Sequence, residues 1–300
     1  MKLTYYRGAV PNFGDELNTY VWPALLPRHF LDDDEDELFV GIGSIIGDQL
    51  PAGARKIVVG SGYAGYMGQP DLGDGTWDVR FVRGPLTAER FGLPPEKAIS
   101  DSAVLLRAME LPAPAHNVGI AFMPHFESLE RGSWAEACAA AGIRLIDATA
   151  PVETVIAELK GARMLITEAM HGAIVADALR TPWVAVRPIF RGHHLKWQDW
   201  SQALGIELRL HQLWPTSLLE LHIGMTGRGG SRGRVGRLNR SPLAVLPNKV
   251  LTHFAAQRLR ELAQAEPQLS ADNRIIEATD RALAEVSALV TEIGETRLAG

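Results

Sequence analysis

Short apolar segments alternate with amphipathic segments along the first two thirds of the chain. Eight apolar runs of three to six residues are typical of buried β-strands, and the segments between them have helical spacing. The runs lie at 3–6, 38–43, 56–60, 79–82, 118–122, 144–146, 164–167 and 183–186. Because strands that alternate with helices form parallel sheets, the pattern predicts an α/β fold with doubly wound sheets.

The helical segments carry their own end signals. Helices are expected over 86–91, 133–141 and 153–160. The last two are followed by Gly142 and Gly161, and glycine commonly ends helices. From residue 241 onward the apolar spacing is helical and predicts one or two C-terminal helices that cover a lobe.

A proline-rich polar segment at 110–117 separates two series of strands, and domain boundaries fall in such segments. The chain is therefore predicted to form two Rossmann-like lobes with a ligand cleft between them. The expected parts are an N-terminal lobe at 1–112, a C-terminal lobe with the donor site at 113–223, a basic flexible loop at 224–240 and C-terminal helices at 241–300.

Composition limits the possible classes of function. Lys and Arg total 30 against 35 Asp and Glu, a net charge of −5, so no global basic field attracts nucleic acid. The single cysteine, Cys138, lies in an alanine-rich helical run and is predicted to be a core residue, and no disulfide framework can form. No apolar run reaches the ~18 residues of a membrane span, and the first residues lack a signal-peptide pattern. We therefore expect a cytoplasmic protein.

The strongest polar constellation follows the run at 164–167 and leads directly into a helix. In an open parallel sheet, ligands bind at the carboxyl ends of strands, where helix N-termini present free N–H groups. His171 is expected at that edge beside Glu168 and Gly172, which are predicted to bind the donor, and Gly172 allows a ligand to approach the backbone closely. An imidazole titrates near neutral pH and suits a general acid or base. The alternative is a histidine that caps the helix or fills a polar niche.

Polar side chains also follow the strands of the first lobe. Asn12, Asp15 and Asn18 come after the first strand, where they either begin a helix or face the cleft. Ser44 and Ser61 lie in glycine-rich turns that follow the next two strands. Such turns suit phosphate binding, and they equally suit tight connections between a strand and a helix.

Basic side chains follow several predicted strands. Arg83 is expected at a strand end with its guanidinium in the cleft, and the competing interpretation is a salt-bridged surface arginine. Arg187 and Arg191 follow the last predicted strand, and His125 follows an earlier one. The two histidines at 193–194 lack the spacing of a convincing metal set, so no zinc site is predicted.

Taken together, a set of ordered segments resembles the polysaccharide pyruvyl transferase family. The segments are NFGDELN, GIGSIIG, GSG, VRGPLTAERFG, DSAVLL, PHF, EAMHGAIVADAL and KWQDW, between residues 10 and 205. The resemblance implies two Rossmann-like lobes similar to glycosyltransferases of the B type. It also implies transfer of pyruvate from phosphoenolpyruvate to a sugar as a cyclic ketal.

The chain departs from the family pattern at one position. The family commonly has Arg-Leu-His-Gly where this chain has Ala-Met-His-Gly at 169–172, and an alanine cannot hold an anion. The cations expected to bind the donor are then Arg83, Arg187 and Arg191. The implied chemistry gives His171 the role of acid or base and makes Asp15 a base for the acceptor hydroxyl. It requires no metal and no cofactor, because phosphoenolpyruvate is a co-substrate.

Two other functions fit the same residues. One is a nucleotide-sugar-dependent glycosyltransferase, and the other is a non-catalytic sugar-binding protein of the same pathway. The expected partners are phosphoenolpyruvate and a sugar acceptor of an exopolysaccharide or its lipid-linked precursor, with no nucleic acid. The segment 224–240 holds five arginines and no acidic residue. It either docks the protein weakly at the inner face of the membrane or is a solvated linker.

Overall fold

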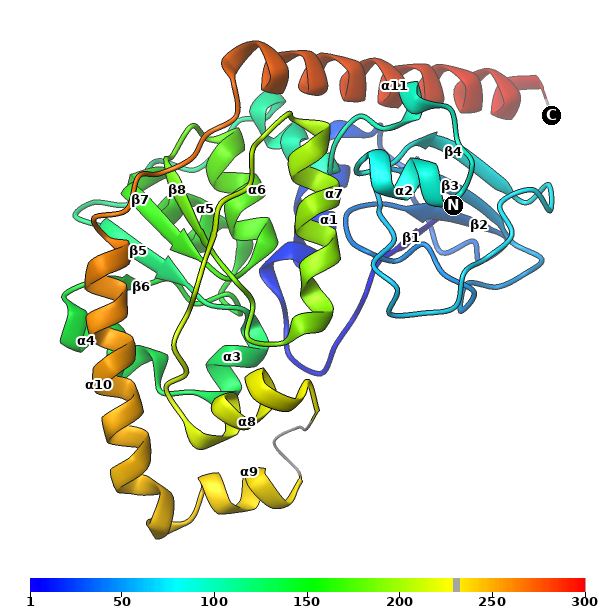
Figure 1. Cartoon of the computed structure of the whole chain (residues 1–300). Coiled ribbons are helices and arrows are strands. Elements are labelled where there is room, and N and C mark those ends of the chain that lie inside the picture. The colour runs from blue at the N-terminus through cyan, green and yellow to red at the C-terminus, as the bar shows by residue number, and fades with distance from the viewer. Residues whose placement is uncertain (229–232, 300) are drawn as a thin grey trace. The chain divides into compact units, whose positions relative to one another are not determined.

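The computed structural model describes residues 1–228 and 233–299, without the side chains of residues 191 and 296–299. The chain forms two compact units, each built from segments that are distant in sequence (Figure 1). Unit 1 comprises Met1–Glu110, Leu195–Glu207 and Ser270–Gly300, and unit 2 comprises Leu111–His194 and Leu208–Leu269. The chain thus leaves unit 1 at the proline-rich segment and returns to it twice.

Unit 1 contains a four-stranded parallel sheet in the order β1-β2-β3-β4. The strands are β1 (Lys2–Thr4), β2 (Glu37–Val40), β3 (Arg55–Val59) and β4 (Trp77–Phe81). Its other elements are α1 (Phe13–Leu25), α2 (Pro85–Arg90), η1 (Pro95–Lys97), η2 (Ser102–Ala108), α7 (His194–Ala203) and α11 (Asp272–Ala299). Leu38, Val40 and Val58 are buried in one core cluster, and Phe39, Ile57 and Val59 are buried as well. Both faces of β2 and β3 are therefore covered, which explains their unbroken apolar runs.

Unit 2 contains a five-stranded parallel sheet in the order β6-β5-β7-β8-β9. The strands are β5 (Gly119–Met123), β6 (Arg144–Leu145), β7 (Ala162–Thr167), β8 (Trp183–Val186) and β9 (Leu210–His211). The helices before β9 are α3 (Phe126–Arg131), α4 (Trp134–Ala141), α5 (Val152–Gly161) and α6 (Met170–Ala178). Counted within the unit, the strand order is 2-1-3-4-5, a doubly wound order whose topological switch lies between β5 and β7.

The predicted glycine signals have two different physical causes. Gly142 adopts a left-handed conformation with φ 69° and ends α4 as expected. Gly161 is the last residue of α5, and a Cβ there would lie 2.1 Å from the carbonyl oxygen of Ala115. The second glycine is therefore required by a close approach of two backbones rather than by a turn.

The C-terminal part of unit 2 is helical. It contains α8 (Leu218–Thr226), α9 (Arg234–Asn239), η4 (Pro242–Ala244) and α10 (Val245–Leu262). Residues 234–239, within the segment expected to be a flexible loop, form helix α9, while residues 229–232 lie outside the described part of the chain. Helix α10 packs against α4 of unit 2, whereas α11 packs against β4 and η2 of unit 1. The two long C-terminal helices therefore belong to different units.

The predicted α/β architecture with parallel sheets is confirmed, and each of the eight apolar runs contains a strand. The short strand β9 was missed, because its sequence has no apolar run. Cys138 is buried in the core of unit 2, as predicted, and burial raises the pKa of its thiol to about 12. Among the described residues, no helix combines the length and the apolar character that crossing a bilayer requires.

Candidate functional site

Polar side chains gather at the carboxyl edge of the sheet in unit 2, beside its topological switch. Met123 at the end of β5 pairs with Thr167 at the end of β7, and Thr167 pairs with Ala185 of β8. The residues that follow these three strands therefore emerge at one edge. In doubly wound sheets this edge is the usual place for a ligand.

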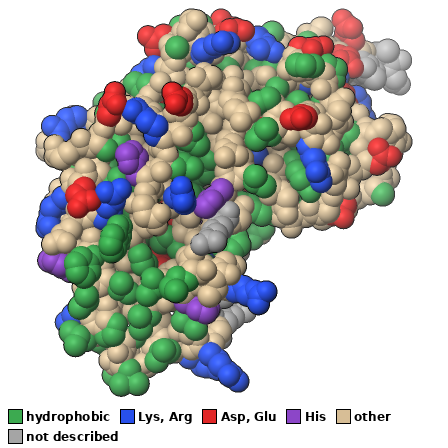
Figure 2. Space-filling view, viewed as in Figure 1, with side chains coloured by type: hydrophobic (Ala, Val, Ile, Leu, Met, Phe, Trp, Pro, Cys, Tyr) green, Lys and Arg blue, Asp and Glu red, His purple; other side chains and the backbone are tan. Residues whose placement is uncertain are grey.

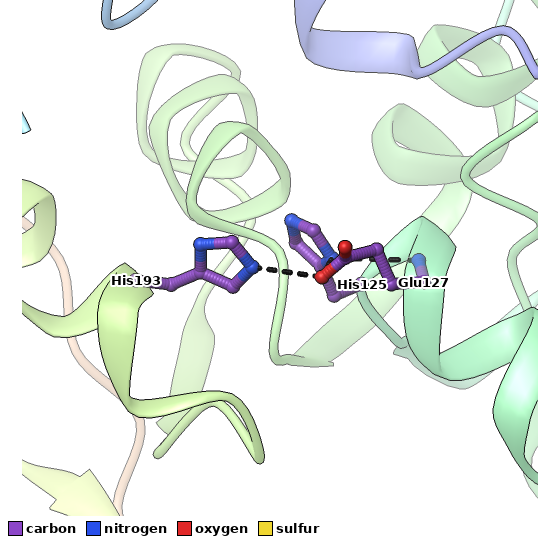
Figure 3. Close-up of side chains that lie close together, drawn as sticks. All are labelled: His125, Glu127 and His193. Atoms are coloured by element: carbon purple, nitrogen blue, oxygen red, sulfur yellow. Dashed lines mark hydrogen bonds and ion pairs between the residues drawn. The ribbon is translucent and has the colours of Figure 1, made fainter. Parts of the chain in front are cut away.

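Two histidines and a glutamate form the central cluster at this edge (Figure 3). His125 follows β5 and caps α3, and Glu127 lies in the first turn of that helix. His193 comes from the turn η3 (Arg191–His193) after β8, and its Nε2 lies 3.0 Å from Oε2 of Glu127. The rings of His125 and His193 are in contact, tilted by 32° with their centroids 4.2 Å apart. The cluster thus joins two segments that are 66 residues apart in the chain.

The charges around Glu127 keep its carboxyl group ionised. Burial alone would raise the pKa of Glu127, but the hydrogen bond with His193 and the charge of Arg131 outweigh it and lower that pKa. The Arg131 guanidinium lies 3.0 Å from Oε1 of Glu127, which leaves Oε2 for His193. A carboxylate beside an imidazole orients the ring and stabilises the charge that develops when the ring takes up a proton.

Glu168 is buried at this edge and connects the segments that follow the strands. Its buried carboxylate accepts hydrogen bonds from the backbone N–H of His125 at 2.9 Å and of Ile189 at 2.8 Å, and from the Ser128 hydroxyl at 3.1 Å. Burial raises the pKa of Glu168 although these three donors oppose the shift. The side chain that we expected to bind the donor therefore joins the segments after β5, β7 and β8, and it acts as a positioning group.

His171 and Gly172 lie in the first turn of α6, at the same edge of the sheet. His171 is half-buried. A Cβ on Gly172 would come within 2.7 Å of the Thr167 hydroxyl and 2.8 Å of the Met123 sulfur. Close packing of α6 on the ends of β5 and β7 is thus enough to require glycine, without a ligand.

Arg187 is the predicted donor-binding arginine that the structure leaves accessible. It follows β8, is exposed, and lines a cavity of about 310 Å³ together with His194, Glu220 and Met225. No carboxylate in the described part of the chain forms an ion pair with it. A free guanidinium at a strand end is suited to bind a phosphate or a carboxylate. The side chain of Arg191 lies outside the described residues.

The central cluster also has the composition of a metal site. The donor atoms of His125, Glu127 and His193 all lie within 4.8 Å of one another. Two imidazoles and one carboxylate can coordinate a divalent transition metal. Nε2 of His193 and Oε2 of Glu127 are also joined by a hydrogen bond, and such a pair can transfer a proton as well as bind a metal.

Three polar residues predicted to face the cleft form hydrogen bonds within unit 1. They are Asn12, Asp15 and Asn18. The Asn12 amide donates to Asp15 at 2.7 Å in the first turn of α1. Asn18 is buried, and its amide exchanges hydrogen bonds with both backbone groups of Ile42 and accepts one from Trp22. Asn18 therefore fixes α1 to the end of β2, and Asp15 is the member of this group that remains a predicted base.

Arg83, expected in the cleft, is completely buried in unit 1. Its Nε donates to Asp199 of α7 at 3.1 Å, and its Nη1 donates to the Ser44 hydroxyl at 2.5 Å. The Asp199 carboxylate also accepts from the backbone and the hydroxyl of Thr87. Its Nη2 donates to the Tyr63 carbonyl at 3.3 Å, so four segments of the chain converge on the guanidinium and hold it inside unit 1. Ser61 is buried nearby and bonds to the Gly43 carbonyl at 3.2 Å.

Glycines make room for this ion pair. A Cβ on Gly62 would lie 2.3 Å from the Arg83 guanidinium carbon, and one on Gly84 would lie 2.0 Å from the Asp199 carbonyl oxygen. The segments GIGSIIG, GSG, VRGPLT and KWQDW therefore meet at one buried contact. Close packing around the ion pair is thus enough to require glycine at positions 62 and 84.

Comparison with known proteins places the whole chain in a family. It is 34% identical over 305 residues to the succinoglycan biosynthesis protein ExoV of Rhizobium meliloti (strain 1021), and the match covers 94% of this chain and 96% of ExoV. The chain belongs to the ExoV family. No family model matches the chain, and no solved structure matches it. Because the match extends over nearly the full length, ExoV family membership applies to both units.

Sequence reasoning missed Glu127 in this ExoV family member and gave His193 no role. Glu127 lies two residues after His125, and that spacing at a strand end was an available signal. His193 was considered only as a metal ligand, because nothing in the local pattern pairs it with Glu127. The edge therefore carries the expected His125, Glu168, His171 and Gly172 together with these two residues, and the expected Arg187 lines a cavity after β8.

Proposed function

We propose that the protein transfers pyruvate from phosphoenolpyruvate to a sugar of an exopolysaccharide or its lipid-linked precursor and forms a cyclic ketal. The observation that carries the proposal is the cluster of His125, Glu127 and His193 at the switch edge of unit 2. The ordered motifs and the relationship to a succinoglycan biosynthesis protein support it. We also propose that the two units correspond to the lobes of a glycosyltransferase-B-like architecture and that the protein acts in the cytoplasm.

The reaction needs an acid, a base and an anion site. A proton adds to the methylene carbon of phosphoenolpyruvate, and a sugar hydroxyl attacks the cationic carbon that results. A second hydroxyl then closes the ketal as phosphate leaves, so that one hydroxyl proton ends on the new methyl group and the other on phosphate. Acid–base groups near neutral pH suit these transfers.

The proposed roles follow from the geometry of unit 2. His193, oriented by Glu127, and His171 on α6 are the groups that move protons at this edge. Arg187 binds the phosphate or carboxylate of the donor, because its guanidinium is accessible where that of Arg83 is not. Arg187 thus replaces the family arginine that is absent at Ala169.

Calorimetric titration with phosphoenolpyruvate tests the proposal most directly. The parent protein is expected to bind phosphoenolpyruvate, and Arg187→Ala is expected to weaken binding roughly tenfold or more, since a charge-assisted hydrogen bond contributes ~1.5–3 kcal/mol. Arg187→Lys should not restore binding, because the planar fork is lost. Arg163→Ala is the matched control, since Arg163 is an exposed arginine at the amino end of β7.

The alternatives give different results in the same experiment. Binding of a nucleotide-sugar without binding of phosphoenolpyruvate would indicate a glycosyltransferase. Binding of an oligosaccharide alone would indicate a non-catalytic sugar-binding protein. Phosphate release that depends on both phosphoenolpyruvate and a sugar acceptor distinguishes the proposed reaction from both.

A further inference from the structure

An unusually apolar surface covers the C-terminal helices of unit 2. Among the described residues, nine of the fifteen exposed large hydrophobic side chains lie between residues 214 and 254. They are Trp214, Leu221, Met225, Leu238, Leu243, Val245, Leu246, Val250 and Phe254. Figure 2 shows hydrophobic side chains gathered over the region of α8, α9 and the start of α10, with Lys and Arg at its border. We call these nine residues the apolar face.

Helix α10 has apolar side chains on two opposite sides. Ala255, Leu259 and Leu262 are buried against the core of unit 2. Leu246, Val250 and Phe254 recur every four residues, which places them on one stripe, and they are 72%, 48% and 46% exposed. The solvent side of a surface helix is normally polar, so an apolar stripe there indicates a binding surface.

Side-chain hydrogen bonds connect the three helices that carry the apolar face. The Asn248 side chain accepts from the backbone of Leu218 at 2.9 Å, and the Asn239 side chain accepts from Leu219 at 3.3 Å. The two asparagines also bond to each other, which joins α8, α9 and α10. The rings of Trp214 and Phe254 lie 6.3 Å apart. These hydrogen bonds thus fix the three helices that carry the apolar face.

The charge of this region is the opposite of that of the rest of the chain. Residues 221–260 contain eight Lys and Arg and no Asp or Glu, which leaves 22 basic against 35 acidic residues elsewhere. The basic side chains that the structure describes as exposed beside the apolar face are Arg228, Arg234, Arg237, Arg240 and Lys249. Apolar residues bordered by arginines are complementary to a lipid surface with anionic headgroups.

We propose that the apolar face and its five exposed basic residues dock the protein on an anionic lipid bilayer. A second copy of the chain is a poorer occupant, because a two-fold interface would bring the same basic residues of both copies together. The apolar residues enter the headgroup region, and the basic residues bind lipid phosphates. Docking itself does not depend on the proposed reaction.

The position of the active edge relative to this surface has a functional consequence. Leu221 and Met225 belong to the apolar face and also line the cavity that contains Arg187. A docked protein therefore presents this cavity next to the bilayer. If the proposed function holds, a sugar on a lipid diphosphate carrier reaches the donor site without leaving the membrane.

Co-sedimentation with lipid vesicles tests the docking. The parent should bind vesicles that contain about 30% phosphatidylglycerol at low salt, and should bind pure phosphatidylcholine vesicles at least about tenfold more weakly. Leu243→Ser with Leu246→Ser should reduce binding to the anionic vesicles about tenfold or more, because both side chains are highly exposed and neither supports the core. Arg234→Ser with Arg237→Ser should weaken binding and reduce its dependence on salt.

The matched controls replace exposed aliphatic and arginine side chains that lie outside the apolar face and its basic border. Ile276→Ser alters an exposed aliphatic residue of α11, and Arg28→Ser with Arg163→Ser removes two exposed arginines. Both controls should bind like the parent. A parent that does not bind anionic vesicles at low salt overturns the proposal. The proposal is also overturned if the parent is a dimer that Leu243→Ser with Leu246→Ser dissociates, while vesicle binding stays unchanged. Vesicle binding needs neither phosphoenolpyruvate nor acceptor, so its failure is distinct from failure of the proposed reaction.

Discussion

The carboxyl edges of the two sheets carry similar kinds of residues and use them differently. In unit 1, the polar groups after the strands bind one another, and Arg83 and Asp199 are completely or almost completely buried. In unit 2, the buried Glu168 holds the backbone of the edge, His125 and His193 are buried beside it, and Arg187 is left exposed at the rim. Motif residues at a strand end can thus build a core or a site.

The two edges differ in whether a carboxylate pairs with the arginine that follows the strand. Asp199 reaches Arg83 from α7, a segment 116 residues further along the chain. In the described structure, no carboxylate reaches Arg187 in the same way. Substitutions at the edge of unit 1 should therefore affect stability, and those in the cluster of unit 2 should mainly affect turnover. The first two of the following predictions test that division.

The largest effect is expected at His193. His193→Ala should lower kcat by about 10²–10⁴-fold if the ring moves a proton, while the free energy of unfolding falls by about 1–3 kcal/mol, because the buried ring's hydrogen bond with Glu127 is lost. Glu127→Gln should shift the pH–rate profile of kcat to lower pH, since the carboxylate that stabilises the protonated ring is lost. His116→Ala, an exposed histidine of unit 2, is the control.

Two outcomes would count against this role of His193. One is turnover within a few-fold of the parent in a folded His193→Ala protein. The other is loss of turnover when a chelator is added, with recovery on adding a divalent metal. The second outcome would make His125, Glu127 and His193 a metal site and would contradict the prediction that no metal is required.

The next largest effect, a loss of stability, is expected from Asp199→Ala. It should lower the free energy of unfolding by about 3–5 kcal/mol, because the Arg83 guanidinium would remain buried without a counter-charge. Urea unfolding measures this loss, and Arg83→Met combined with Asp199→Leu should recover much of it. Glu266→Ala, which breaks the exposed pair with Arg209, should cost at most about 1 kcal/mol. Equal midpoints for Asp199→Ala and the parent would refute the structural role.

The smallest predicted effect concerns the pH dependence of unit 2. Burial, which outweighs the hydrogen bonds from Thr216 and Trp134, raises the pKa of Glu220 from 4.5 to about 7. Between these pH values the folded protein binds more protons at Glu220 than the unfolded chain does, so stability falls as pH rises, by up to about 3 kcal/mol. Glu220→Gln should remove this part of the slope in urea unfolding, and the exposed Glu153→Gln should not. An unchanged slope in Glu220→Gln would contradict the prediction.

Much of the fold could be predicted, because it depends on local patterns. Buried parallel strands are apolar throughout, so runs such as those of β2, β3 and β8 were recognisable. The elements that were not predicted have weak sequence patterns. Strand β9 consists of only Leu210 and His211, and α9 lies among glycines and arginines. The outward apolar stripe of α10 was also missed, since helical spacing alone does not tell which side faces the core.

The sequence by itself determined the α/β class, the positions of strands β1 to β8 and the polar residues that follow them. It placed Arg83, His125, His171 and Arg187 after strands or at helix starts, because these positions depend on neighbouring residues. Only the tertiary structure decided how deeply each of them lies: Arg83 and His125 are buried, His171 is half-buried, and Arg187 is exposed. Arg83 meets Asp199 across 116 residues and Glu127 meets His193 across 66, and no local periodicity encodes such contacts.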